Sequence, residues 1–372
     1  MQQGNTVVER NNDTRNQEGN RFTVFTEGDE LYADMLAAIH AARGSIDLEC
    51  YIFDPDVIGM RFIDALVARA RDGVQVRLHL DAFGSISLAF SHVETRLHEA
   101  GVELKWFNPW RWYAPLRFNR RNHRKLLVVD GDKAWLGGFN IHVDNSLQEF
   151  GQGRWRDTQV RIEGPLGAEA QEYFNYLWEG RRRWRPGIKD KADSFLVSNH
   201  NILQRHRFRR LLLNQFRSAQ RSICLSTPYF MPDRLTQKAM ARAARRGIEV
   251  KLLVPFKTDR PMTQLAARAA YGMLLDAGVR IFEYQPRILH AKTAIFDDEE
   301  CTVGTANLDY RSFFVNFELN LVSFDRGLVQ RLAEDFRRDL QESEEVTPTR
   351  WAERGLLRRV GELIGWLARK IL

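Results

Sequence analysis

Two stretches of this chain repeat one succession of hydrophobic and polar positions. In each, a helical pattern leads into a strand-like run, then an amphipathic helix, a Gly turn and a second apolar strand, which is the order of a βαβ unit. The first stretch predicts helices over 33–43 and around Phe62, Leu66 and Ala70, and strands over 45–53 and 74–80. The second predicts helices over 208–219 and 235–245, and strands over 222–230 and 248–254.

A further strand is predicted in each half, over 102–106 and 279–284. The expected fold class is therefore α/β, with two similar α/β/α sandwich domains that have mixed β-sheets and a pseudo-twofold relation. An active site is expected at their interface. The expected organisation is a flexible N-terminus over 1–20, domains over 21–190 and 191–345, and an amphipathic C-terminal tail over 346–372.

One motif, His-x-Lys-x4-Asp, occurs in both halves with a matched tail. Each His is followed 14 residues later by a Gly and 17 residues later by an Asn. One chance match has a probability of roughly one or two in a hundred, so two matches in identical register are not accidental. The motif residues are His123, Lys125, Asp130 and Asn140 in the first half and His290, Lys292, Asp297 and Asn307 in the second.

These residue types indicate phosphate chemistry. Strand side chains repeat every two residues, so each motif His is expected to share a face with its Lys. A phosphodiester needs a nucleophile, an acid for the leaving alcohol and fixed positive charge on its oxygens, which two imidazoles and two ammonium groups supply. Asn140 and Asn307 can donate hydrogen bonds to the same oxygens. No metal or other cofactor is expected, since the lysines provide the charge. Either motif alone also fits a strand with a surface His and a solvated Lys.

An acidic partner is expected behind each His, because a nucleophilic imidazole presents one nitrogen while the other stays bound to its proton. The candidates lie downstream at comparable distance: Asp157 is 34 residues after His123, and Glu318 is 28 residues after His290. Glu149 is an alternative in the first half. A simple ion pair with a nearby Arg is the other interpretation of each carboxylate.

Composition and charge fit a globular protein that binds an anionic partner. The chain is 44% hydrophobic and 28% charged with a net charge of +7, and a basic surface suits anionic lipid and nucleic acid equally well. The three widely spaced cysteines are expected to be reduced structural thiols. No run of 18 apolar residues occurs, so no transmembrane span is expected.

Other segments favour lipid over nucleic acid. Residues 105–118 interleave aromatic and basic side chains, which suits a bilayer interface, a single-stranded nucleic acid or a loop whose rings are buried over the cleft. Residues 83–90 form a second apolar loop. Residues 347–372 predict an amphipathic basic helix that lies on a membrane or docks on its own domain.

On these motifs the chain resembles the phospholipase D superfamily, over about residues 22–337. Residues 119–125, 137–140 and 304–312 resemble bacterial cardiolipin synthases, in the branch without N-terminal membrane helices. Gly138 departs from the Ser or Thr that often occupies this position, as Thr305 does in the second half. A hydroxyl contact to phosphate is therefore expected from Thr305 alone.

The resemblance implies a phosphatidyltransferase with a phosphohistidine intermediate. His123 is expected as the nucleophile and His290 as the acid and base, while Asp130 and Asp297 tend to be structural partners within the catalytic motif. With phosphatidylglycerol as donor and acceptor, the products are cardiolipin and glycerol; with water as acceptor, the enzyme is a phospholipase.

The implied partners are a phospholipid substrate and an anionic membrane surface, at the cytoplasmic face of the bacterial inner membrane, bound peripherally. No nucleic acid is expected as a partner, and the oligomeric state is not indicated. A phospholipase D hydrolase, a phosphodiesterase or nuclease of the same superfamily, and a non-catalytic scaffold that binds anionic lipid are the alternatives.

Overall fold

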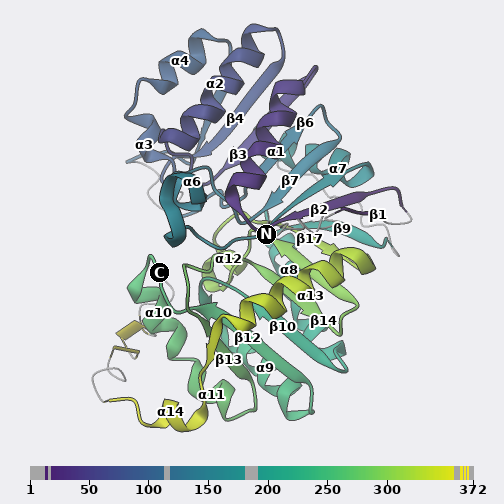
Figure 1. The fold of residues 1–372 in the computed structure, drawn as a ribbon, viewed down its shortest axis with the longest axis vertical. Helices are drawn as coiled ribbons and strands as arrows, with labels where there is room; N and C mark the ends of the chain where they lie inside the picture. Colours follow the sequence, from purple (N-terminus) through teal and green to yellow (C-terminus); the bar gives the residue numbers. More distant parts are fainter. Residues whose placement is uncertain are drawn as a thin grey trace, which may run out of the picture.

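The protein consists of two α/β units stacked along its long axis, the first above the second in Figure 1. The structure is a computed structural model and describes residues 13–15, 18–112, 118–180, 192–355, 361, 362, 364, 365 and 367. The expected fold class, two similar α/β/α sandwiches with mixed sheets, is confirmed.

The first unit contains one eight-stranded sheet with the strand order β1-β2-β8-β7-β6-β3-β4-β5. Its strands are β1 (Asp13–Arg15), β2 (Arg21–Phe25), β3 (Ser45–Cys50), β4 (Gln75–Asp81), β5 (Glu103–Phe107), β6 (Leu126–Val129), β7 (Lys133–Gly137) and β8 (Gln159–Glu163). Its helices are α1 (Gly28–Ala41), α2 (Val57–Arg71), α3 (Ile86–Ala89), α4 (Val93–Glu99), α6 (Leu147–Phe150) and α7 (Pro165–Trp178).

The second unit has the same plan, with the strand order β18-β13-β12-β10-β14-β15-β17-β9. Its strands are β9 (Ser194–Ser198), β10 (Ser222–Ser226), β12 (Glu249–Pro255), β13 (Arg280–Tyr284), β14 (Thr293–Phe296), β15 (Glu300–Gly304), β17 (Leu319–Ser323) and β18 (Ser343–Glu345), and β11 (Phe230–Met231) pairs with β16 (Leu308–Asp309) apart from them. Its helices are α8 (Ile202–Ser218), α9 (Arg234–Arg245), α10 (Pro261–Arg268), α11 (Tyr271–Leu275), α12 (Tyr310–Phe314), α13 (Arg326–Gln341) and α14 (Pro348–Ala352).

The two strand orders superimpose when one is reversed. The series β2-β8-β7-β6-β3-β4-β5 corresponds to β9-β17-β15-β14-β10-β12-β13, with β1 and β18 added at opposite edges. In each unit the βαβ strands predicted from the sequence are parallel (β3-β4-β5 and β10-β12-β13), and the strand after the His motif is antiparallel to them. The repeated sequence pattern thus reflects a duplicated fold.

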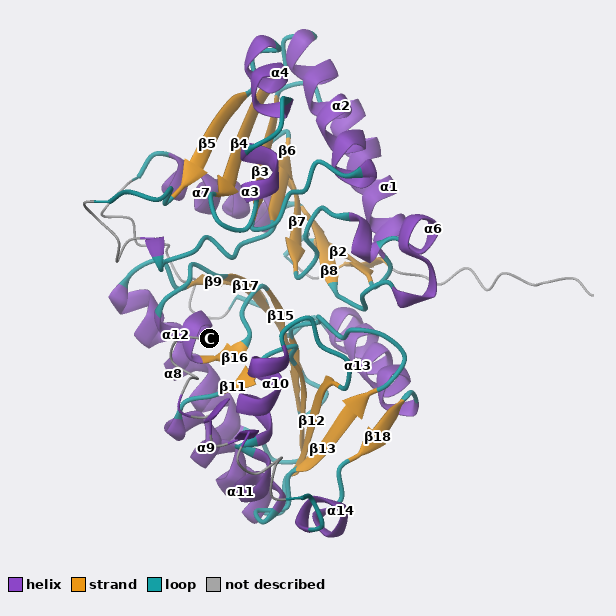
Figure 2. Ribbon diagram, turned by 90° about the vertical axis from the view of Figure 1, so that its left-hand side faces the viewer, coloured by secondary structure: helices purple, strands orange, loops and turns teal. Residues whose placement is uncertain are grey.

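Helices cover both faces of each sheet, as Figure 2 shows. Residues of α1, α2 and α4 pack on the outer face of the first sheet, and residues of α8, α9 and α11 pack on the outer face of the second. The inner faces share one core with α7 and α13, in which Leu126 and Val128 of β6 and Leu319 and Leu321 of β17 are buried. This common core holds the two units against each other.

The predicted domain boundary at 190/191 falls in a stretch that lies outside the described residues. The strand β9 (Ser194–Ser198) is the first described element of the second sheet after it, and β18 (Ser343–Glu345) is the last. The segment 1–12 of the expected N-terminal lead-in also lies outside the described residues.

Candidate active site

Backbone pairing between the two units places both motif histidines at their interface. Asn122 forms a parallel bridge with Phe317, and Arg156 forms one with Leu289. The N–H of His123 donates to the Phe317 carbonyl at 3.0 Å, and the N–H of His290 donates to the Arg156 carbonyl at 2.7 Å. Each histidine is therefore fixed by main-chain hydrogen bonds to the other unit, next to that unit's candidate carboxylate.

Each histidine is paired with the acid of the opposite half. His123 Nδ1 lies 3.0 Å from Glu318 Oε2, and His290 Nδ1 lies 2.5 Å from Asp157 Oδ2. The sequence had assigned Asp157 to His123 and Glu318 to His290, and that pairing is wrong because the bridges cross between units. Glu149, the alternative for the first half, instead forms an ion pair with Arg61.

Thr305 acts on Glu318 rather than facing the cleft. Its side chain is fully buried and its hydroxyl donates to Glu318 Oε2 at 2.6 Å, while Ser312 Oγ donates to Oε1 at 2.8 Å. The expected phosphate contact from Thr305 is therefore not what this geometry shows. With both oxygens bound by hydroxyls, the Glu318 carboxylate has one orientation toward His123.

Gly138 leaves the space that Asp157 occupies. A Cβ at Gly138 would lie 2.0 Å from Asp157 Oδ1 and 2.6 Å from Oδ2. The position corresponds to Thr305 in the other half, where a hydroxyl holds a longer Glu side chain. The absence of a hydroxyl at this position, seen in the sequence as a departure, thus follows from the shorter acid and its close approach to the backbone.

The motif lysines lie behind the histidines and not in the cleft wall. The motif His and Lys precede β6 and β14 rather than lying within them, and both Lys side chains are buried. Lys125 Nζ donates to the His123 carbonyl at 2.8 Å. Lys292 Nζ donates to the His290 carbonyl and lies 2.9 Å from His290 Nδ1 and 3.7 Å from Asp157 Oδ2. Their charges act on the cleft from behind.

Burial and neighbouring charges shift the titration of this cluster. Burial lowers the pKa of His123 to about 4 although Glu318 opposes it, and burial with the charge of Lys292 lowers the pKa of His290 to about 4. Burial and the charge of Lys292 also lower the pKa of Lys125 to about 7. Both rings are therefore neutral near pH 7 in the free protein. A phosphodiester anion placed between them would favour protonation of either ring.

The two carboxylates remain ionised. Burial alone would raise the pKa of Asp157, but Lys292 and His290 outweigh it and hold that pKa below its ordinary value. For Glu318, His123 and Lys125 likewise overcome burial and lower the pKa. An ionised carboxylate accepting the Nδ1 proton leaves the Nε2 lone pair of a neutral imidazole free for a substrate atom.

The motif aspartates lie away from this cluster, at the ends of the strands that follow the motifs. Asp130 has φ 51° and its carboxylate accepts N–H groups of Arg43, Gly44 and Ser45 at 2.7–3.1 Å. Asp297 repeats this arrangement at φ 57°, accepting from residues 220–222 at 2.7–2.9 Å. Both side chains bind the turn between helix and strand and make no contact with the histidines.

Both motif asparagines line the cleft. Asn140 Oδ1 accepts the N–H of Ile52 at 3.1 Å, so the amide NH2 is the end available to a ligand. Asn307 Nδ2 lies 3.5 Å from Asp309 Oδ2, and its buried Oδ1 is without a hydrogen-bond partner among the described residues. Their donation to phosphate oxygens stays a prediction.

The cleft between the units has a volume of about 310 Å³ and contains residues to which the sequence gave no role. Tyr51 and Tyr229 stand edge-on to His123 and His290, with ring centroids 5.0 and 6.2 Å apart, and Trp155 lies 5.1 Å from His290. Each tyrosine follows the first strand of its unit's βαβ series, β3 or β10, but the strand registers align Tyr51 with Pro228 and Tyr229 with Ile52. A position-by-position comparison of the two halves would therefore not have identified them.

Three arginines also line the cleft, and they differ in whether a carboxylate already neutralises their charge. Arg121 pairs with Asp81 at 3.3 Å and Arg260 with Asp259 at 3.6 Å. Within the described residues, the side chain of Arg311 bonds only to uncharged oxygens, those of Asn119 at 2.9 Å and of Asn316 at 3.5 Å. Arg311 is thus the cleft cation whose charge a bound anion would neutralise.

Part of the aromatic segment before the first motif lies at the mouth of this cleft. Phe118 lines it, and the rings of Phe83 and Trp110 stand edge-on to Phe118 at 5.8 and 5.2 Å. Trp110 is 64% exposed and Trp112 84% exposed, so these two rings are not buried in a core. Residues 113–117 of the segment lie outside the described residues.

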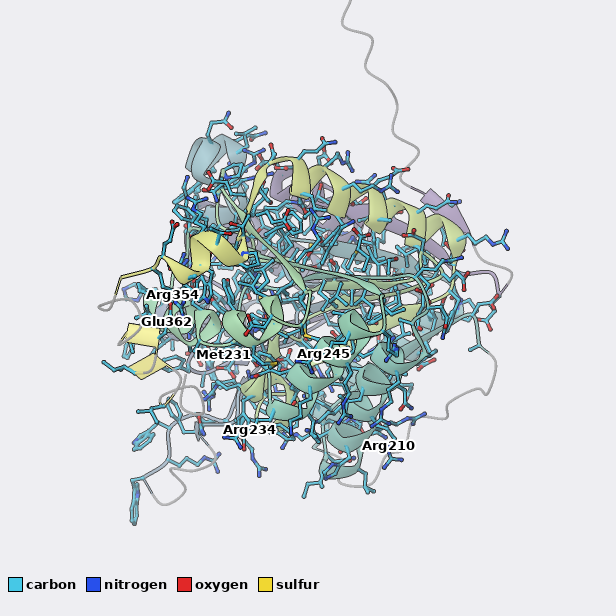
Figure 3. The ribbon with its side chains drawn as sticks, turned by 90° about the horizontal axis from the view of Figure 1, so that it is seen from below. Arg210, Met231, Arg234, Arg245, Arg354 and Glu362 are labelled. Atoms are coloured by element: carbon cyan, nitrogen blue, oxygen red, sulfur yellow. The ribbon has the colours of Figure 1, made fainter. Side chains whose placement is uncertain are left out.

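The described part of the C-terminal tail packs on its own domain, as Figure 3 shows near Arg354 and Glu362. Arg354 Nε lies 3.2 Å from both oxygens of the buried Glu362, and Trp351 lies 5.1 Å from Tyr271. A Cβ at Gly365 would lie 2.5 Å from the Ala266 nitrogen, so the glycine permits close packing on α10. Of the two alternatives for the tail, docking on its own domain fits these residues. The described part of the tail does not include residues 356–360, 363, 366 and 368–372.

Within the described ranges, no group of three or more His, Cys, Asp or Glu side chains is arranged to hold a metal ion. No helix in that part of the chain is long and apolar enough to cross a membrane.

The fold and the duplicated site define a phospholipase D-like protein. A phosphatidylserine synthase from Haemophilus influenzae has the same fold, with a TM-score of 0.72 and 14% identity over 94% of this chain and 95% of that one. A polyphosphate kinase from Porphyromonas gingivalis has a TM-score of 0.63 and 13% identity, covering 94% of this chain and 53% of the kinase. At these identities the likeness establishes the fold alone.

Sequence relatives define the family more narrowly. The family model "Cardiolipin synthase, PLD-like domain" matches residues 35–178 and 212–340. The chain is 32% identical to the probable cardiolipin synthase YwiE of Bacillus subtilis over 91% of its own length and 70% of the relative's. It is 36% identical to cardiolipin synthase 2 of Bacillus anthracis over 91% and 68%. The chain therefore belongs to the cardiolipin synthases, phosphatidyltransferases of the phospholipase D superfamily, and this function implies association with membranes.

Proposed function

We propose that this cardiolipin synthase transfers a phosphatidyl group from one phosphatidylglycerol to another through a phosphohistidine on His123. The observation that carries the proposal is the pair of buried imidazoles, each bound through Nδ1 to an ionised carboxylate and each lining the same cleft. One ring is then available as a nucleophile and the other for proton transfer.

In the first step, His123 Nε2 attacks the phosphorus and the bond from phosphorus to the glycerol oxygen breaks. Protonated His290 gives its proton to the leaving oxygen, and glycerol departs. In the second step, neutral His290 takes the proton from the hydroxyl of the second phosphatidylglycerol. That oxygen attacks phosphorus, the bond from phosphorus to His123 breaks, and cardiolipin is released.

A difference between the two halves supports His290 as the acid and base. Asp157 Oδ2 lies 2.5 Å from His290 Nδ1, whereas Glu318 Oε2 lies 3.0 Å from His123 Nδ1. The closer carboxylate stabilises the protonated imidazole of His290 more strongly. In this proposal the amide NH2 groups of Asn140 and Asn307, which line the cleft, donate hydrogen bonds to the phosphoryl oxygens. The lysines behind the histidines supply positive charge when the bound anion favours their protonated form.

We further propose that Arg311 binds the phosphodiester of the acceptor lipid. The acceptor phosphatidylglycerol carries its own negative phosphate, which needs a cation other than those at the reacting phosphorus. Arg311 lines the cleft, and its side-chain hydrogen bonds within the described residues go to neutral oxygens, so its charge is open to such an anion. A bound acceptor also excludes water, which favours transfer over hydrolysis.

The enzyme is proposed to work peripherally on an anionic membrane surface, at the cytoplasmic face of the bacterial inner membrane. The exposed rings of Trp110 and Trp112 near the cleft mouth support an interfacial location.

The test is an assay of the purified protein with phosphatidylglycerol vesicles and no added metal, with the products resolved by mass. Cardiolipin with free glycerol is the expected result. Phosphatidic acid as the main product would overturn the transfer proposal in favour of a hydrolase. Cleavage of an oligonucleotide without lipid turnover would favour the nuclease alternative. Denaturation with SDS at neutral pH during turnover is expected to trap the phosphatidyl group on His123 and not on His290, because the bond from phosphorus to imidazole nitrogen is labile in acid.

A further inference from the structure

Two neighbouring surface helices of the second unit carry only positive charge. The helices α8 and α9 contain nine Lys and Arg residues and no Asp or Glu. They run side by side, because Arg246, just after α9, donates to the Phe216 and Ala219 carbonyls at the end of α8, and Arg209 of α8 pairs with Asp233 at the start of α9. All the charged side chains within these two helices are therefore basic.

The basic side chains converge on a shallow pocket of about 70 Å³ between the two helices. Its lining includes the cations Arg217, Lys238, Arg242 and Arg246 together with apolar Leu213 and Leu235, and contains no carboxylate. Arg210, Arg234 and Arg245, which are labelled in Figure 3, are exposed and extend the same surface. An anionic group approaching this surface meets several cations and no repelling charge.

Exposed aliphatic side chains adjoin the basic surface at the end of the helices nearest the cleft. Ile202 and Leu203 at the start of α8 are 70% and 67% exposed, and Leu235 at the start of α9 is 53% exposed. Three exposed aliphatic side chains next to a purely basic surface form an amphipathic arrangement, in which apolar groups enter the acyl layer while cations bind head groups.

The buried side of α8 contacts residues that lead to the mouth of the active-site cleft. Arg205 of α8 donates to the Phe314 carbonyl, and its guanidinium lies 5.7 Å from the Phe317 ring. Phe317 in turn lies 5.1 Å from Phe107, the last residue of β5, after which Trp110 and Trp112 follow. In Figure 2, α8, α9 and the segment after β5 project to one side of the two sheets.

We propose that the outer surface of α8 and α9, with Ile202, Leu203 and Leu235, is the docking face that binds an anionic phospholipid bilayer. Resting on the proposed function, this contact presents the cleft mouth and its exposed tryptophans to the lipid. The aliphatic residues favour a bilayer over a nucleic acid, because nucleic acid is held by phosphate contacts and by rings that stack on bases, and aliphatic side chains provide neither.

The experiment measures co-sedimentation with vesicles of phosphatidylglycerol or of phosphatidylcholine, in the His290→Ala background so that the lipid is not consumed. The test variant combines Arg210→Gln, Lys238→Gln and Arg242→Gln. The matched control removes the same charge from exposed residues elsewhere, with Arg71→Gln, Lys133→Gln and Arg337→Gln.

The test variant is expected to lose at least about tenfold in affinity for phosphatidylglycerol vesicles, since each basic residue near an anionic surface adds to binding. The control variant is expected to bind phosphatidylglycerol vesicles like the parent. Neither variant is expected to bind phosphatidylcholine vesicles strongly. A second variant, Ile202→Ser with Leu203→Ser, is expected to weaken binding further at high salt, where charge attraction is screened.

Turnover of a soluble phosphodiester, measured without the His290 substitution, separates docking from chemistry. The docking variants are expected to retain this turnover while losing activity on vesicles, whereas failure of the proposed function would abolish turnover in the parent as well. Equal vesicle binding by test and control variants would overturn the docking face. Loss of oligonucleotide binding with unchanged vesicle binding would assign the surface to nucleic acid instead.

Discussion

The Nδ1 atom of His290 lies 2.5 Å from Oδ2 of Asp157, although the two residues belong to different units of the fold. The reciprocal contact joins His123 to Glu318 at 3.0 Å. Each half therefore lacks the carboxylate that orients its own histidine, and the site is complete only when both units are in contact. Both contacts lie in the buried interface, so separation of the units would disrupt both at once.

The crossed pairing predicts which step each carboxylate supports. Asp157→Asn is expected to lower turnover of phosphatidylglycerol by about 10² to 10⁴-fold, because the imidazole loses its orienting acceptor. Phosphoenzyme formation from a p-nitrophenyl phosphodiester is expected to survive, since this leaving group needs no proton from His290. Glu318→Gln is expected to abolish both reactions. Stopped-flow release of p-nitrophenol measures phosphoenzyme formation in both variants. If the p-nitrophenyl substrate restored this step in Glu318→Gln and not in Asp157→Asn, the assignment of the two carboxylates would be contradicted.

Gly138→Ser tests the fit between backbone and acid in the first half. A Cβ there would lie 2.0 Å from Asp157 Oδ1, so the carboxylate has to move away from His290. We expect a loss of about 1–3 kcal/mol in the free energy of unfolding, together with a fall in kcat. Thr305→Ser is the matched control, because it keeps the hydroxyl that binds Glu318. Denaturant titration and lipid assay of both variants give the result, and a fully active Gly138→Ser would show that Asp157 is not held as described.

Arg311→Gln is expected to change the choice of acceptor. Loss of a charge-assisted contact to the acceptor phosphate should reduce transfer to phosphatidylglycerol by about tenfold or more, and hydrolysis should rise relative to it. Transfer to labelled free glycerol, a neutral acceptor, is expected to change little. Arg311→Lys should recover part of the lost transfer. Equal losses with lipid and glycerol acceptors would argue against a role at the acceptor phosphate.

The motif aspartate Asp130 is expected to affect stability and not chemistry. Asp130→Ala removes an acceptor for three backbone N–H groups and places Ala at φ 51°, so we expect a loss of about 1–3 kcal/mol in unfolding free energy. Asp130→Asn keeps an acceptor and tolerates this backbone conformation, and its kcat should stay close to that of the parent. A kcat loss in Asp130→Asn comparable to that of a histidine variant would assign the aspartate to catalysis.

Stability is expected to fall as the pH drops through the range in which unfolded histidine binds protons. His123 and His290 have pKa values near 4 in the folded protein against an ordinary value of 6.5. Between these values the unfolded chain binds more protons, so unfolding free energy decreases by up to about 1.4 kcal/mol per pH unit for each histidine as pH falls. From about one pH unit above 6.5 upward, the two histidines contribute no pH dependence.

Denaturant titrations at several pH values in this range measure how the free energy of unfolding changes with pH. The double variant His123→Asn with His290→Asn is expected to show a shallower dependence, and His92→Asn with His98→Asn, two exposed histidines, is expected to match the parent. An unchanged slope in the first variant would mean that the buried rings do not titrate as described.

Local pattern was enough to predict the repeated elements. The strand predicted over 74–80 is β4 (Gln75–Asp81), the helix over 235–245 is α9 (Arg234–Arg245), and the strand over 279–284 is β13 (Arg280–Tyr284). These elements follow from hydrophobic spacing and Gly turns, which are properties of neighbouring residues. The paired motifs, likewise, were recognised from spacing alone, and the family comparisons confirmed the cardiolipin synthase interpretation.

The sequence by itself determined the duplicated α/β architecture, the two histidines and the two acids that accompany them. Only the tertiary structure decided that each acid serves the histidine of the other half, because the bridges Asn122–Phe317 and Arg156–Leu289 form between units. It also decided that Thr305 binds Glu318 and that Tyr51 and Tyr229 line the cleft. Residue spacing reports which side chains are near along one chain segment, whereas contacts across an interface depend on how two folded surfaces meet.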